Sequence, residues 1–114
     1  MLAQIGENIK TKEMKLLIIT ASMEFDKNIK EILKKSDVKT FSYKRVKGYR
    51  DVTEESISNN WFATEMNENE STLFYAFIKK ENVDHVFEQV SQFNAKQETI
   101  SKIHVAVLNV EKSN

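Results

Sequence analysis

The order of the apolar patterns along this chain constrains its fold more than any other feature. Two segments carry apolar residues at helical spacing. They contain Phe25, Ile29, Ile32 and Leu33, and Val83, Val86, Phe87 and Val90. Four runs rich in β-branched and aromatic residues predict strands, at 15–21, 38–49, 71–78 and 102–111. The resulting order, βαββαβ, predicts an α+β, ferredoxin-like fold with an antiparallel sheet and both helices on one face. The other face carries Phe and Tyr, which favours oligomerisation.

Composition limits the alternatives further. At 114 residues, 40% of them hydrophobic, the chain suits a single domain, which we place at 14–114 after a frayed extension at 1–13. The formal net charge is zero, so the overall charge favours neither nucleic acid nor a membrane surface. There is no cysteine, which excludes disulfides and thiolate chemistry. The longest apolar run, 73–78, cannot span a bilayer, and no signal peptide is recognisable, so we expect a cytoplasmic protein.

A charge boundary follows the second predicted strand, in the stretch SYKRVKGYRD at 42–51. Between positions 39 and 50 there are several cations and no acid. They are Lys39, Lys44, Arg45, Lys47 and Arg50. Clustered cations favour a phosphate or carboxylate ligand, although lysines also protect solvated strand edges from aggregation. Gly48, one of only two glycines, predicts a bend with positive φ where the strand ends and a ligand approaches the backbone closely.

The following segment is acidic and contains no Lys or Arg up to position 70. Its acids are Asp51, Glu54, Glu55, Glu65, Glu68 and Glu70. They suit a hard cation or a basic partner, or simply a solvated loop. We expect 51–60 to be mobile without a ligand. Trp61, the only tryptophan, favours a docking role or packing onto its own domain equally. A strand at 61–66 is expected to pair with 71–78 across a turn at 67–70.

Residues that would indicate an enzyme or a metal site are sparse. His85 and His104 have no metal-ligand spacing, and ordinary surface or core roles are favoured over a transition-metal site. No Ser-His-Asp arrangement and no Gly-rich phosphate motif is present. The sequence therefore favours a non-enzymatic protein. A cofactor-free ferredoxin-like enzyme, of oxygenase or isomerase type, remains the alternative from another class.

The segment EILKKSDVKTFSYKRVKGYRD at 31–51 resembles PII signalling proteins between their first helix and second strand. Its most specific part is 46–49, Val-Lys-Gly-Tyr, which is similar to the step where the family's T-loop begins. The resemblance continues in order through 73–78, 82–93 and 103–110 at the level of pattern. It indicates a divergent PII-like protein with a short T-loop.

The resemblance implies a homotrimeric regulatory protein that binds a small effector at inter-subunit clefts and controls a partner, such as a membrane transporter. The implied ligand-binding residues are Lys44, Lys47, Gly48, Tyr49 and Arg50. The implied partner loop contains Asp51, Glu54, Glu55 and Trp61. An adenine nucleotide, bicarbonate or a divalent metal is the effector class that family members suggest, and nucleic acid is not an expected partner.

The chain departs from the typical family pattern in its phosphate-binding elements. Residues 93–102, FNAKQETISK, contain no glycine where the family has a Gly-rich loop before the last strand. The C-terminal arginines are also missing, because the chain ends NVEKSN, and no Gln closely follows Gly48. ATP binding in the usual manner is therefore not expected. A CutA-like metal-tolerance protein, which shares the trimeric fold, is a further alternative, but no segment specifically resembles it.

Overall fold

The structure, a computed structural model, describes residues 14–49, 68–98 and 100–114. The elements are β1 (Met14–Ser22), a 3-10 turn η1 (Met23–Phe25), α2 (Asp26–Lys35), β2 (Ser42–Tyr49), β3 (Glu68–Lys79), α4 (Lys80–Ala95) and β4 (His104–Asn109). The predicted βαββαβ order is confirmed. None of the described helices is both long enough and apolar enough to cross a membrane.

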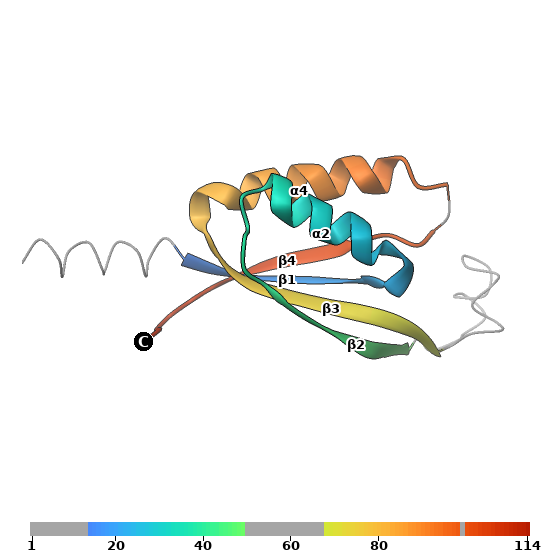
Figure 1. Ribbon diagram of the computed structural model, residues 1–114, viewed down its shortest axis with the longest axis horizontal. Coiled ribbons are helices and arrows are strands. Elements are labelled where there is room, and N and C mark those ends of the chain that lie inside the picture. Colours follow the sequence, from blue (N-terminus) through green and yellow to red (C-terminus); the bar gives the residue numbers. More distant parts are fainter. Residues whose placement is uncertain (1–13, 50–67, 99) are drawn as a thin grey trace, which may run out of the picture.

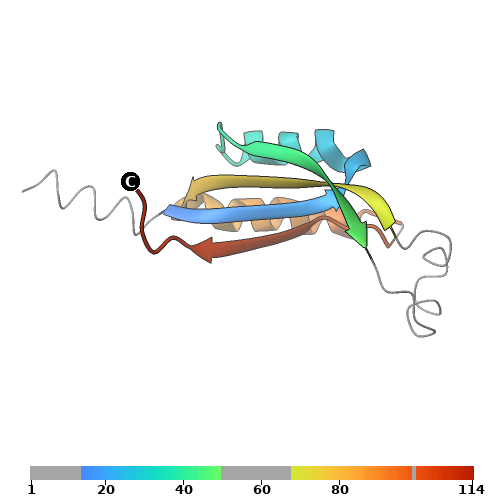
Figure 2. The same cartoon turned by 90° about the horizontal axis from the view of Figure 1, so that it is seen from below.

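The four strands form one antiparallel sheet in the order β2-β3-β1-β4. Strands β3 and β1 are therefore central, and β2 and β4 are the edges. Both helices pack on the same face of the sheet (Figure 1). Figure 2 looks onto the opposite face, which neither α2 nor α4 covers and which we call the open face. The ferredoxin-like prediction is thus confirmed down to the one-sided packing of the helices.

The core lies between the sheet and the two helices. The period of two along a strand sends Leu17 and Ile19 of β1, and Phe74 and Ile78 of β3, toward the helices, where they are buried. The helices meet them with the predicted apolar stripes, which include the buried residues Ile29, Ile32, Leu33, Val86 and Val90. Phe87 is an exception, because its side chain is 37% exposed.

The second strand begins later than its sequence predicts. It starts at Ser42 rather than at position 38 because Val38 serves to close α2. Asp37 adopts a left-handed conformation with φ of 61°. The Asp37 N–H donates to the Lys34 carbonyl at 3.2 Å and the Val38 N–H donates to the Leu33 carbonyl at 2.9 Å. Val38 and Leu33 are both buried, which completes a Schellman motif with aspartate at the position where glycine is usual.

This left-handed aspartate gives a stability prediction. Asp37→Gly is expected to raise the free energy of unfolding by about 0.5–1 kcal/mol, because glycine adopts this conformation without a Cβ clash. The lost ion pair to Lys39 is long, 3.8 Å, and exposed, so it contributes little. Urea denaturation measures the change. Asp37→Ala removes the carboxylate but keeps Cβ, and a matching gain in that variant would contradict the backbone explanation.

Candidate ligand site on strand β2

The predicted ligand residues lie on β2, but they do not share one face of it. The register pairs Lys44 with Leu73 and Arg45 with Thr72, and Thr72 is buried beneath the helices. Successive residues of a strand point to opposite faces. Lys44 and Gly48 therefore lie on the open face. Arg45, Lys47 and Tyr49 lie on the helix-facing side.

The predicted bend at Gly48 is wrong. Gly48 lies inside β2, where it pairs with Asn69, and its φ is not positive. The strand continues to Tyr49 because the ladder with β3 extends that far. Glycine is thus not required by the backbone conformation at this position. Because glycine has no side chain, it still leaves space on the open face at this position.

Arg45 is a structural residue rather than a free cation. Its Nη1 lies 2.6 Å from Oδ2 of Asp26, the first residue of α2, and it also donates to the Thr72 hydroxyl. The Asp26 side chain is only 15% exposed and Thr72 is fully buried. Arg45 therefore joins the edge strand to a helix N-terminus and to the neighbouring strand. An acidic residue in the first turn of α2 was the only sequence signal for this pair.

Tyr43 anchors the same side of β2 near α2. Its ring stacks on Phe74 with centroids 5.0 Å apart, and the Lys30 ammonium lies 4.4 Å from the ring centroid. The Lys30 ammonium also donates to the Tyr43 hydroxyl at 3.1 Å. These contacts fix the start of the strand, so that its far end is presented from a rigid base.

Two lysines of β2, Lys44 near its start and Lys47 near its end, are exposed cations. Within the described part of the chain, neither Lys44 nor Lys47 forms an ion pair within 4.0 Å, and both are exposed. Lys47 lies opposite Glu70 in the register, and Tyr49 beyond it is 67% exposed. The helix-facing side of this strand end therefore offers an ammonium and an aromatic ring, with Glu70 on the neighbouring strand.

Several predicted residues lie outside the described residues. These are Arg50, Asp51, Glu54, Glu55, Trp61 and Glu65, together with the extension at 1–13, the mobile segment expected at 51–60 and the strand expected at 61–66. What the sequence indicates for them stays a prediction, with one exception. The expected turn at 67–70 and the pairing of 61–66 with 71–78 are wrong, because 68–70 belong to β3 and the two sides of β3 pair with β1 and β2.

The two histidines lie on different elements. His85 Nδ1 of α4 lies 2.9 Å from the hydroxyl of Ser36, the C-cap of α2, and so links the two helices. His104 begins β4 on the open face, opposite Thr20. Among residues 14–49, 68–98 and 100–114, no three His, Asp or Glu side chains gather as a metal-ligand set.

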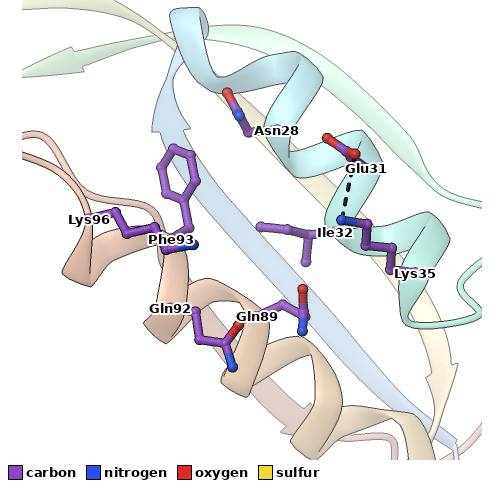
Figure 3. A pocket seen from close by; sticks show the side chains of 8 residues that line it. All are labelled: Asn28, Glu31, Ile32, Lys35, Gln89, Gln92, Phe93 and Lys96. Atoms are coloured by element: carbon purple, nitrogen blue, oxygen red, sulfur yellow. Dashed lines mark ion pairs between the residues drawn. The ribbon is translucent and has the colours of Figure 1, made fainter.

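Sequence reasoning missed a groove between the two helices. It has a volume of about 170 Å³ and runs between α2 and α4 (Figure 3). Ile32 and Phe93 contribute apolar surface, and Asn28, Gln89 and Gln92 contribute amides. Lys35 pairs with Glu31 at 3.6 Å beside it. Lys96 also lines the groove, but no histidine does, so the groove does not resemble a histidine-based acid–base centre.

No protein-family model and no curated protein matches this chain. Solved structures do match its fold. B. subtilis GlnK in complex with ATP is 21% identical, with a TM-score of 0.59, and the match covers 84% of this chain and 82% of that one. The nitrogen regulatory PII-like protein CPII from Thiomonas intermedia, bound to ADP, AMP and bicarbonate, is 14% identical, with a TM-score of 0.58 and coverage of 89% and 96%.

This chain has a PII-like fold. Arabidopsis thaliana PII bound to citrate agrees, at 13% identity and a TM-score of 0.62, with 87% of this chain and 78% of that chain covered. The resemblance stated from residues 31–51 is thereby confirmed for the fold. In the PII-like fold of this chain, β2 and β3 flank the segment 50–67, so the predicted ligand residues lie at the base of that connection.

Proposed function

We propose that this PII-like chain is a regulatory protein that binds a small anionic effector at the end of β2 and controls a partner protein. The supporting observation is the exposed lysine Lys47, which lies beside the exposed Tyr49 at the junction with the segment 50–67. Structurally similar proteins carry the anions ATP, ADP, AMP, bicarbonate or citrate. An exposed ammonium group favours such ligands through charge-assisted hydrogen bonds.

The effector site proposed here lies between copies of the chain. The open face exposes aromatic and aliphatic side chains that a folded protein ordinarily covers. Tyr75 is 43% exposed, Phe77 is 55% exposed and Leu108 is 46% exposed. A homotrimer that covers this face would turn Lys44 and Gly48 toward a neighbouring copy and leave Lys47 and Tyr49 at the margin of the interface. In this arrangement Lys47, Tyr49 and Arg50 contact the effector, and Gly48 leaves room for the neighbour.

The acidic segment beyond Arg50 carries the proposed output. Asp51, Glu54 and Glu55 would feel a change in field when an anion binds near Lys47, and Trp61 supplies an apolar contact for the partner. A membrane transporter is the partner class that we propose, for a protein located in the cytoplasm. Bicarbonate and an adenine nucleotide are the anionic effectors to test first, and a divalent metal is the alternative. Residues 93–102 lack the glycines of a typical phosphate loop, so a nucleotide would be bound without it.

The Lys47 contact can be tested directly. Lys47→Ala is expected to weaken binding of the effector by about ten- to a hundredfold, because loss of one charge-assisted hydrogen bond typically costs about 1.5–3 kcal/mol. A thermal-shift screen of nucleotides, bicarbonate, citrate and divalent metals identifies the effector, and calorimetric titration measures its affinity.

The matched control is Lys34→Ala, which removes an exposed cation of α2 rather than of β2. It should bind the effector like the parent. Parental affinity in both Lys47→Ala and Arg50→Ala would instead identify the basic strand as a solvated edge. Turnover of a substrate by the purified chain, with no requirement for Lys47, would favour the enzymatic alternative.

A further inference from the structure

The open face is basic as well as apolar. The registers put the even-numbered residues of β1, β2 and β4 on this face, with the odd-numbered residues of β3. Its basic side chains are Lys44, Lys79 and His104. Among the side chains that the structure describes, none on this face is an acid. If a second copy of the chain packed against this face through its own open face, basic side chains would meet, and the described residues of that face would supply no acidic partner for them.

The polar groups of the open face gather at one end of it. One row across the sheet runs Lys44, Leu73, Thr20, His104 from β2 to β4. In the next row, Ser22 pairs with Ser71. Thr20, Ser22 and Ser71 are half-buried, and their hydroxyls can donate hydrogen bonds. We call Thr20, Ser22, Lys44 and His104 the polar end.

The opposite end of the same face is apolar. Leu16 pairs with Phe77 on one side and with Leu108 on the other, and the next row contains Tyr75 and Ile18. Lys79 lies beyond these rows at the end of β3, where its long side chain can reach solvent past the interface. The basic side chains that a second copy would bury are therefore Lys44 and His104 of the polar end.

We propose that the polar end binds a small oxyanion, such as phosphate or bicarbonate, between copies of the chain. This inference rests on the proposed function, because the anion is held only where copies cover the open face. An ammonium taken out of water without a counter-charge is costly, whereas a bound oxyanion supplies both charge and acceptor oxygens. The hydroxyls of Thr20 and Ser22 and a ring N–H of His104 donate to the remaining oxygens.

The spacing of the row is compatible with one small anion per copy. Neighbouring strands lie about 4.8 Å apart, so that Thr20 is one strand from His104 and on the order of 10 Å from Lys44. The four-carbon stem of lysine spans much of that distance across Leu73. An anion above Thr20 is thus within reach of the histidine from one edge strand and the lysine from the other. Lys47 points to the opposite face and belongs to the effector site.

The test uses inorganic phosphate and the full chain with Lys47→Gln, which silences the effector site. Sedimentation velocity at matched ionic strength compares phosphate with chloride, and calorimetry measures the phosphate affinity. Phosphate is expected to lower, at least tenfold, the protein concentration at which half of the trimer has dissociated. Adding Lys44→Gln or Thr20→Val should abolish most of that effect. Thr20→Ser retains a hydroxyl and Lys79→Gln removes a cation outside the polar end, so both should respond like the Lys47→Gln chain.

The outcomes separate this inference from the proposed function. A trimer that responds equally to phosphate and chloride overturns the anion site and leaves the regulatory proposal standing. Equal loss of the phosphate effect in Lys44→Gln and Lys79→Gln also overturns the anion site, because the response would then be general charge screening. If the chain remains monomeric at all concentrations, no second copy covers the open face, and both proposals are wrong.

Discussion

Replacing Arg45 with alanine is expected to lower the free energy of unfolding by about 2–4 kcal/mol. Arg45 pairs with Asp26 at 2.6 Å and donates to the buried hydroxyl of Thr72. Its loss leaves a carboxylate that is only 15% exposed without its cation, and Thr72 without this donor. Half of the Arg45 side chain is exposed, so solvent moderates the loss relative to a fully buried pair.

Urea denaturation followed by circular dichroism measures this loss, with Lys47→Ala as the control. Lys47 lies two residues further along the same side of β2 and forms no ion pair within the described residues, so its variant should stay within about 0.5 kcal/mol of the parent. A cycle with Asp26→Ala should give a coupling of about 1 kcal/mol or more. Equal losses in Arg45→Ala and Lys47→Ala would show that the pair contributes little.

Phe77→Glu is expected to convert the proposed trimer to monomers at micromolar concentration. Phe77 is 55% exposed on the open face and pairs with Leu16, next to Leu108. If a second copy covers this face, the substitution puts a carboxylate among apolar groups and removes a large aromatic contact. Burial of an unpaired charge costs several kcal/mol, which is enough to displace an assembly equilibrium by orders of magnitude.

Sedimentation velocity over a range of concentrations gives the result. Phe87→Glu is the matched control, because it makes the same change at an aromatic residue of α4, which is on the other side of the sheet and 37% exposed. It should assemble like the parent. If Phe77→Glu and the parent sediment identically as trimers, the open face is not the interface; if the parent is a monomer, the trimer prediction itself is wrong.

The sheet could be predicted from the sequence because its pattern is local. Alternate residues of β1 and β3, such as Ile19 and Phe74, are apolar and buried. The predicted apolar stripe from Phe25, which lies in η1, to Leu33 of α2 is also buried. The start of β2 could not be predicted in the same way. Asp37, rather than the glycine usual at that position, adopts the left-handed conformation, so the sequence carried no clear signal that Val38 would close the helix.

The candidate site was harder to predict because it depends on faces and on distant pairs. The cations from Lys44 to Lys47 look like one cluster in the sequence, but the strand separates Lys44 from Arg45 and Lys47. The partner of Arg45 is Asp26, in another element, which no local pattern indicates. The groove between α2 and α4 is lined by amides such as Gln89 that look like ordinary surface residues in a sequence.

The central place of β1 also governs how the chain can fold during synthesis. β1 is made first, but its neighbours on the two sides are β3 and β4, and the Lys15 ammonium bonds to Asn109, 94 residues later. At about 5–20 residues per second, β1 waits several seconds on the ribosome before either neighbour exists. During that interval an apolar, β-branched strand is open to non-native pairing. A nascent chain cut short before β4 is therefore expected to aggregate, even though most of its core residues have already been made.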